Sequence, residues 1–231
     1  MKTASFIFIS CFLFTLSENF LPGTAQPTVP DPVLDTAAFS VNFPLGTAQK
    51  FPAPVLDTAG QQLRSGVNYY ILPAKGGNGG GVTFATGVDS RCPYEVAQAS
   101  DKGDNGIPVM FAPFDGDSII RVDTDSNIRF IDFRPPVTCP ESHVWTLNSN
   151  RTFIETGGVE GQTGPQNINN WFKIQTYDDA YQLQYCPGTD VCGNPCGILL
   201  LCENIGILAD NGKRALALNQ PAPFKVVFTR A

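Results

Sequence analysis

Few side chains in this chain are of the types that most often do chemistry in proteins. It has one histidine, His143, and seven cysteines. A nucleophile needs a base beside it, so one histidine leaves little material for a catalytic pair. The carboxylates are numerous but scattered between hydrophobic runs, and no two are marked as a glycosidase pair. These residues predict that the protein is not an enzyme and that it needs no cofactor.

The cysteines allow two chemistries, disulfide bonding and metal binding. Six of them follow residue 25, and the last four are clustered: Cys92, Cys139, Cys186, Cys192, Cys196 and Cys202. Four thiolates would suit zinc, but no C-x-x-C pair is present. An even number of cysteines in an exported chain favours three disulfides and no metal. Six cysteines can pair in 15 ways, and spacing alone does not choose among them.

Two other segments resemble ligand-binding motifs but lack residues that the motifs require. Asp123–Asn127 begins like a calcium loop, yet Ile128 stands in place of the glycine and Arg134 in place of the final glutamate. Gly76–Gly81 lacks the Lys-Ser/Thr of a phosphate loop and is better read as a hairpin loop. Asn150 begins the sequon Asn-Arg-Thr, so we expect it to carry a glycan if it is exposed.

The first 25 residues have the pattern of a secretory signal peptide. Lys2 supplies a positive charge, Ser5–Leu16 is apolar, and Gly23–Ala25 offers a small-x-small cleavage site. The apolar run has 12 residues, whereas a transmembrane helix needs about 20. We therefore expect residues 1–25 to be removed, Cys11 with them, and the product to be exported and free of the membrane.

The charge of the chain is acidic. It has 15 Lys and Arg against 21 Asp and Glu, a formal net charge of −6. No basic stripe is available to neutralise phosphates, which argues against nucleic acid and against anionic membrane surfaces as partners.

From Pro54 onward, short β-branched and aromatic runs alternate with Gly, Pro, Asn and Asp, and no stretch has a helical period over 11 residues. This pattern is typical of an all-β barrel or sandwich of about a dozen strands. The expected strands are Asn68–Leu72, Val82–Phe84, Tyr94–Ala97, Val109–Phe111, Ile119–Val122, Ile128–Phe133, Val144–Leu147, Thr152–Ile154, Trp171–Gln175, Gln182–Tyr185, Gly206–Leu208, Ala215–Leu218 and Lys225–Phe228.

A short duplication marks the start of this region. The sequence PVLDTA occurs at residues 32–37 and again at 54–59. In the second copy Gly60 and Tyr69 follow Asp57 by three and twelve residues, whereas the same offsets from Asp35 in the first copy fall on Ala38 and Thr47. The first copy therefore cannot form the same hairpin, and we take the second copy as the first strand. The sequence therefore predicts three parts: a signal peptide at 1–25, a Pro-rich leader at 26–53 and a folded domain at 54–231.

The motifs of this domain resemble those of plant Kunitz-type inhibitors, the soybean trypsin inhibitor family. The stretch VLDTAGQQLRSGVNYYI fits the N-terminal signature of that family at Val55, Asp57, Gly60, Leu63, Tyr69 and Ile71. The resemblance continues to the C-terminus through RCP (91–93), IRVDTDSNIRF (120–130), HVWTL (143–147), ETGGVEGQTGP (155–165), NNWFKI (169–174), QLQYCP (182–187) and NGKRALAL (211–218). It is strongest to the miraculin-like branch, judging by RVDTDSNI, VWTL and the four clustered cysteines.

This resemblance implies a fold, disulfide pairs and a function. The fold would be a β-trefoil of about twelve strands with pseudo-threefold symmetry. The pairs would be Cys92–Cys139, Cys186–Cys202 and Cys192–Cys196. The function would be that of a secreted protease inhibitor in plant defence, in the apoplast or the vacuole, with a serine, cysteine or aspartic protease as partner. No cysteine is left for a covalent dimer, so we expect a monomer.

The resemblance also places a reactive loop, which a family inhibitor offers to the protease as a rigid substrate mimic. The loop tip falls on Phe114–Ser118, and the Arg or Lys of trypsin-directed members falls on Gly116. Asp115 and Asp117 flank that glycine, so the tip should repel the Asp-lined pocket of trypsin. Ser65 replaces the asparagine that commonly supports the loop. We therefore expect poor inhibition of trypsin, and improvement on Gly116→Arg.

Other targets and an alternative function stay open. Phe114 suits a chymotrypsin- or subtilisin-like pocket, and Asp115 or Asp117 suits an Asp-preferring protease. Alternatively, the tip is a solvated turn, since Asp-Gly is a turn dipeptide. The protein would then be a non-inhibitory, miraculin-like defence, storage or sugar-binding protein.

Overall fold

The computed structural model describes residues 51–86, 92–132, 134, 139–193, 196, 202–210 and 212–231. They belong to one compact unit that runs from Gln49 to Ala231. The expected signal peptide and leader residues 26–50 lie outside the described residues. Within the described ranges, no helix combines the length and the hydrophobicity that a membrane crossing requires.

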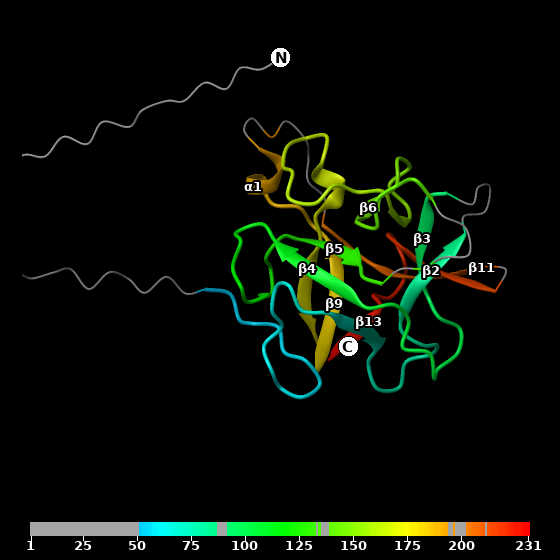
Figure 1. Ribbon diagram of the computed structural model, residues 1–231. Coiled ribbons are helices and arrows are strands. Elements are labelled where there is room, and N and C mark those ends of the chain that lie inside the picture. The colour runs from blue at the N-terminus through cyan, green and yellow to red at the C-terminus, as the bar shows by residue number, and fades with distance from the viewer. Residues whose placement is uncertain are drawn as a thin grey trace, which may run out of the picture. The chain divides into compact units, whose positions relative to one another are not determined.

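In the described ranges the regular secondary structure is almost entirely β-strand, which confirms the expected fold class (Figure 1). The strands are β1 (Tyr69–Pro73), β2 (Val82–Thr86), β3 (Tyr94–Gln98), β4 (Val109–Pro113), β5 (Ser126–Phe130), β6 (Trp145–Leu147), β7 (Ile154–Thr156), β8 (Lys173–Tyr177), β9 (Ala180–Tyr185), β10 (Glu203–Asn204), β11 (Gly206–Asp210), β12 (Lys213–Ala217) and β13 (Lys225–Arg230). Two short helices accompany them, a 3-10 turn at Ile168–Asn170 and α1 at Thr189–Cys192.

The strands form two antiparallel sheets. A seven-stranded sheet has the order β10-β9-β13-β1-β4-β5, with β8 beside β9. A six-stranded sheet has the order β11-β12-β3-β7-β6, with β2 beside β3. β1 pairs with β13 from Tyr69↔Arg230 to Pro73↔Val226, so the first and last strands of the domain are neighbours. β4 pairs with β5 as a hairpin, and residues 114–125 connect them.

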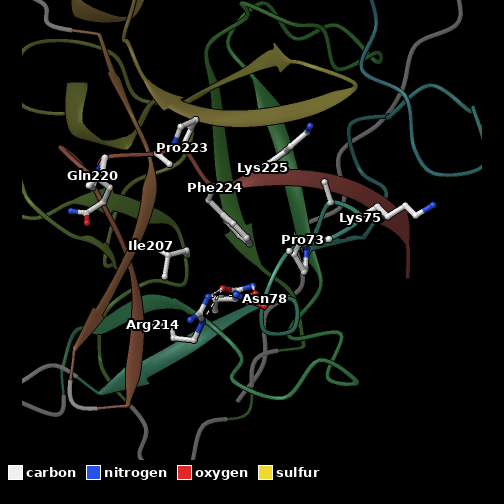
Figure 2. Close-up of a pocket in the computed structure, with 15 residues that line it drawn as sticks. Pro73, Lys75, Asn78, Ile207, Arg214, Gln220, Pro223, Phe224 and Lys225 are labelled. Carbon is white, nitrogen blue, oxygen red and sulfur yellow. Dashed lines mark hydrogen bonds between the residues drawn. The ribbon is translucent and has the colours of Figure 1, made fainter.

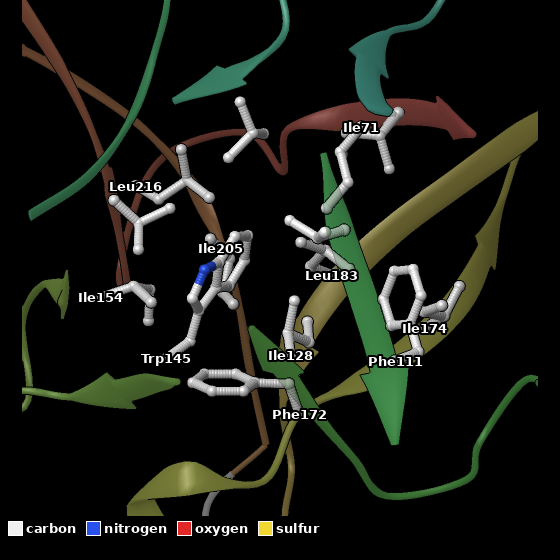
Figure 3. Packing of buried hydrophobic residues seen from close by; sticks show 14 of the residues in the cluster. Ile71, Phe111, Ile128, Trp145, Ile154, Phe172, Ile174, Leu183, Ile205 and Leu216 are labelled. Atoms are coloured by element: carbon white, nitrogen blue, oxygen red, sulfur yellow. The ribbon is translucent and has the colours of Figure 1, made fainter. Parts of the chain in front are cut away.

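The core lies between these strands and is built from large apolar side chains (Figure 3). In β1 and β4 the first three residues alternate buried and less buried side chains, as strands with one face inward do, whereas all five residues of β3 are buried. The largest fully buried side chains are Trp145, Trp171, Tyr94, Tyr185, Phe111, Phe130, Phe172, Phe228, Leu63, Ile71, Ile120 and Ile128. Trp145 lies edge-on to Phe172, with ring centroids 6.4 Å apart. These packed aromatic side chains form a rigid scaffold that carries the loops.

One expected strand is wrong. Residues 119–122 form no continuous strand, only isolated bridges from Ile119 to Arg64 and from Arg121 to Pro54. The run is apolar because Ile120 is fully buried, and its backbone bonds to the N-terminal hairpin instead of to a sheet strand. Asp123, with φ 60°, then turns the chain toward β5.

That N-terminal hairpin explains the spacing of the family signature. Leu56 bridges Gln62, and a side-chain oxygen of Asp57 accepts the backbone N–H groups of Ala59 and Gln61 at 2.9 and 2.8 Å. Gly60 completes the turn with φ 75°, a conformation that glycine adopts without strain. Asp57 and the glycine three residues later therefore act together in one turn.

Candidate functional site

The loop that the sequence marks as functional projects from the end of the β4–β5 hairpin. In Figure 1 this green loop lies beside the cyan segment with which the described chain begins. Phe114, Asp115, Gly116 and Ser118 are exposed, and Asp117 is half-buried. Phe114 is 41 % exposed, one of the few large hydrophobic side chains of the described residues that face solvent to this degree. The loop thus offers an apolar side chain at a convex point of the surface.

The tip is a tight turn. The N–H of Gly116 donates to the carbonyl oxygen of Pro113 at 3.1 Å, which places Phe114 and Asp115 at the centre of the turn. The N–H of Phe114 donates to the carbonyl oxygen of Asp125 at 2.8 Å, so the turn is fixed to the far end of the same loop. These two bonds hold the backbone on both sides of the exposed phenylalanine.

Gly116 occupies the left-handed region, with φ 69°. A Cβ atom there would meet nothing within 4 Å, so space is available, but any other side chain strains the backbone. An arginine at Gly116 would therefore add backbone strain at the tip, and its expected improvement of trypsin inhibition stays a prediction.

The two carboxylates of the tip accept hydrogen bonds from groups of the same loop. Asp115 accepts the N–H of Asp117 at 3.0 Å through Oδ1. Asp117 accepts the N–H of Ile119 at 3.1 Å through Oδ1, and its Oδ2 accepts Nε of Arg121 at 3.0 Å. The hydrogen bond from Arg121, and next that from Ile119, hold the pKa of Asp117 below its usual range. Asp117 therefore carries a partnered charge, and Asp115 is the carboxylate that faces solvent.

The second half of the loop rests on the N-terminal hairpin. The N–H of Ser65 donates to the carbonyl oxygen of Ser118 at 3.0 Å, and the N–H of Ile120 donates to that of Leu63 at 2.9 Å. Ser65 thus contacts the loop through its backbone. That this contact supports inhibition stays a prediction.

The exposed phenylalanine has a buried aromatic neighbour that sequence reasoning did not connect with it. The rings of Phe114 and Trp171 meet edge to face, with centroids 5.9 Å apart. Trp171 is itself fixed, because its Nε1 donates to the carbonyl oxygen of Gln162 at 3.1 Å. Part of the phenylalanine is therefore packed while part is exposed, a pre-ordered arrangement that reduces the entropy lost on binding.

The base of the loop is tied to the cysteine-rich segment by Asp125. This side chain is 8 % exposed, lies 3.7 Å from Nζ of Lys173 and accepts the N–H of Gly188 at 3.1 Å. Burial raises the pKa of Asp125 to about 6, although Lys173 acts in the opposite direction. A carboxyl that titrates near pH 6 thus links the end of the loop to the chain beside Cys186.

The six cysteines form three disulfides: Cys92–Cys139, Cys186–Cys202 and Cys192–Cys196. These are the pairs that the resemblance implies. In the part of the chain that the structure describes, one group of potential metal ligands, Cys92, Cys139 and Glu141, has ligand atoms within 4.8 Å of one another. Both sulfurs belong to a disulfide, so this group offers no thiolate to a metal.

Comparison with known proteins decides the family. The family model described as "Trypsin and protease inhibitor", the legume Kunitz family, matches residues 55–230. The chain belongs to the plant Kunitz-type inhibitor family. Kunitz trypsin inhibitor 5 of Arabidopsis thaliana is 39 % identical to it, over 80 % of this chain and 89 % of that protein. Miraculin of Synsepalum dulcificum is 37 % identical, over 84 % of this chain and 90 % of that protein.

The fold of this Kunitz protein is likewise that of its relatives. The structure of a bifunctional α-amylase/subtilisin inhibitor from Oryza sativa superposes with a TM-score of 0.62 at 34 % identity, covering 78 % of this chain and all of that one. The fold is therefore the β-trefoil of the Kunitz family.

The expected glycosylation site lies on an exposed turn of the Kunitz domain. Asn150 is exposed between β6 and β7, and its carbonyl oxygen accepts the hydroxyl of Thr152 at 3.3 Å. The turn is closed by the N–H of Arg151, which donates to the carbonyl oxygen of Asn148 at 2.9 Å. Because Asn150 is exposed, a glycosylating enzyme can reach it. That Asn150 carries a glycan stays a prediction.

A concave site lies on another part of the Kunitz domain, between the ends of β1, β3, β12 and β13. It is a pocket of about 590 Å³ (Figure 2). Nε and Nη2 of Arg214 donate to Oε1 of Gln98 at 3.0 and 2.7 Å, and Nε2 of Gln98 donates to the carbonyl oxygens of Asn78 and Gly80 at 2.6 and 2.9 Å. Phe224 forms an apolar wall. Arg214, Gln98 and Asn78 thus bond to one another, whereas Lys225, which also borders the pocket, pairs with Asp178 and Asp179 outside it.

Proposed function

We propose that this protein is an exported inhibitor of serine endopeptidases with chymotrypsin- or subtilisin-like specificity, that it acts in plant defence, and that it inhibits trypsin poorly. The observation that carries the proposal is the position of Phe114. Its side chain is 41 % exposed at the centre of a turn whose backbone is bonded to Pro113 and Asp125. An aromatic side chain on such a pre-ordered loop is what a deep apolar specificity pocket accepts.

The charges of the tip support the same specificity. No cation stands between Phe114 and Ser118, and Asp115 faces solvent. The Asp-lined pocket of trypsin gains no ion pair from this tip and is repelled by the carboxylate. Relatives of this chain are named as subtilisin inhibitors as well as trypsin inhibitors, so the family accommodates the proposed target.

The test is an inhibition panel with purified protein against subtilisin, chymotrypsin, trypsin, papain and an aspartic protease. The proposal predicts that subtilisin or chymotrypsin is inhibited with nanomolar affinity and that trypsin is inhibited at least about 100-fold more weakly, a difference of about 3 kcal/mol. Replacing residues 114–118 by a Gly-Ser loop of equal length should abolish the inhibition. Inhibition of papain or the aspartic protease that survives this replacement would point to another loop.

A second function is favoured by the shape of the tip. Proteases bind peptides in extended form, as an added strand, whereas residues 113–116 form a closed turn with a left-handed glycine. If no protease accepts this closed turn, the protein is a non-inhibitory, miraculin-like defence, storage or sugar-binding protein. If the protein inhibits none of the five proteases in the panel, that result would favour this second function over the first.

A further inference from the structure

Arg121 lies at the junction between the candidate loop and the chain that precedes the Kunitz domain. Its Nε donates to Oδ2 of Asp117 at 3.0 Å, and its Nη1 donates to the carbonyl oxygen of Pro52 at 3.1 Å. Its guanidinium carbon lies 5.4 Å from the ring centroid of Phe51. The side chain is only 18 % exposed, so the surrounding protein covers most of it.

The backbones of the two segments are also joined. Arg121 forms a bridge with Pro54, and the N–H of Val122 donates to the carbonyl oxygen of Ala53 at 3.0 Å. The N–H of Val55 donates to the carbonyl oxygen of Ile120 at 2.9 Å. Residues 53–55 therefore run beside residues 120–122, antiparallel to them.

Part of this contact lies outside the family match, which begins at residue 55. Phe51, Pro52 and Ala53 belong to the leader that the sequence alone assigns to no structure. Phe51 is 68 % exposed, yet one face of its ring meets the guanidinium. The forked guanidinium suits this place, because its separate N–H groups bond the loop carboxylate and the leader carbonyl at once.

We propose that Arg121 is a positioning residue of the reactive loop, and that Phe51–Ala53 is its second anchor. Asp117 belongs to the tip, so Arg121 connects the tip to the leader through one side chain. The last residues of the leader are then part of the unit that a protease meets. Processing that removes them loosens the loop without touching the disulfides or the core. The consequence for inhibition rests on the proposed function; the ordering of the loop does not.

The experiment compares full-length variants by two readouts, amide hydrogen exchange of residues 117–122 and the inhibition constant for the protease found in the panel. In Arg121→Gln, exchange at Ile119 and Val122 should rise at least about tenfold, because a charge-assisted bond is lost. The inhibition constant should rise about tenfold with it. In Phe51→Ala both effects should be about two- to fivefold, the size of an exposed cation–π contact.

Two further variants separate positioning from general stability. Arg121→Lys keeps a charge near Asp117 but loses the fork, so it should restore part of the loop protection without restoring the leader contact. Lys225→Gln is the matched control, since Lys225 also combines ion pairs, to Asp178 and Asp179, with a ring contact, to Tyr177. It should leave exchange at residues 117–122 and the inhibition constant unchanged.

The outcomes distinguish this inference from the proposed function. Unchanged exchange at residues 117–122 in both Arg121→Gln and Phe51→Ala overturns the inference, even if a protease is inhibited. Raised exchange in the loop with no protease inhibited supports the positioning role and rejects the proposed function. If Arg121→Gln unfolds, Phe51→Ala still decides, because its exposed ring can be removed without opening the core.

Discussion

The loop at residues 114–118 and the pocket around Arg214 show opposite uses of polar groups. In the loop, carboxylates and backbone groups bond one another and leave an apolar side chain, Phe114, directed to solvent. In the pocket, Arg214 and Gln98 bond one another at the base of a hollow, and Figure 2 shows the amino groups of Lys75 and Lys225 directed away from it. The loop is built to present a group, whereas the pocket uses its polar groups for its own structure.

This difference supports the proposal that a partner binds the loop. A convex, pre-ordered apolar side chain is the usual centre of a protein interface. Arg214 and Gln98 are already paired, so a polar ligand that bonds to either of them replaces an existing bond and gains little. Under the proposed function, recognition belongs to the loop and stability to the pocket, and the following variants test that assignment.

The largest effect is expected for Phe114→Ala. Removing the exposed ring should weaken inhibition by about 2–4 kcal/mol, or roughly 30- to 1,000-fold, as for the central residue of an interface. Inhibition constants for the variant and the unaltered protein measure this. Leu56→Ala, which removes a similarly exposed side chain (39 %) from the N-terminal hairpin, should have little effect. Equal losses in the two variants would show that recognition does not centre on Phe114.

Gln98→Ala should lower the stability of the fold and leave the inhibition constant unchanged. Gln98 is 3 % exposed, and its removal takes one hydrogen bond from each of the carbonyl oxygens of Asn78 and Gly80 and two from Arg214, which keeps the 3.4 Å bond from its Nη2 to Asn78. We expect a loss of about 1–3 kcal/mol in the free energy of unfolding, measured by urea denaturation. A weaker inhibition constant at unchanged stability would instead place the pocket in the interface.

Much of this comparison could be predicted from the sequence, but not its decisive contacts. The strands, the hairpin around Asp57 and the position of the loop follow from short-range patterns and from the family motifs. The contacts of Phe114 with Trp171 and of Arg121 with Pro52 join residues far apart in the chain, and no local pattern encodes them. The prediction of a strand at 119–122 was wrong for a related reason. The apolar residues of this run correctly predict burial, but a strand forms only where another backbone segment pairs with it, and the local sequence does not show this.

Gly116→Ala tests whether the left-handed tip is required. Alanine at φ 69° should lower the free energy of unfolding by about 1–2 kcal/mol, although nothing obstructs its side chain. Thermal or urea unfolding measures the loss. Gly116→Arg should show a similar loss of stability, and it should inhibit trypsin better than the unaltered protein, without reaching nanomolar affinity, because it supplies the cation for the Asp-lined pocket on a strained backbone. Nanomolar trypsin inhibition by Gly116→Arg would mean that the tip opens readily.

Asp125→Asn should change the pH dependence of stability. The pKa of Asp125 is raised from an ordinary 3.8 to about 6, so between these values the folded state binds more protons than the unfolded state. Its contribution to stability is therefore greatest below about pH 4, falls as pH rises to about 6, and is constant above that. The asparagine variant should lack this fall, which we expect to be on the order of 1 kcal/mol. The midpoints of urea unfolding at pH 4.5 and 7 are compared between the unaltered protein and Asp125→Asn. An equal change of the midpoint with pH in the two proteins would contradict the prediction.

The most direct test of the central assignment is amide hydrogen exchange of the protein alone and in complex with the protease that it inhibits best. We predict slower exchange in the complex at residues 114–122 and unchanged exchange at residues 74–80 and 220–224, which border the pocket. Slower exchange around the pocket, with the loop unchanged, would contradict the account.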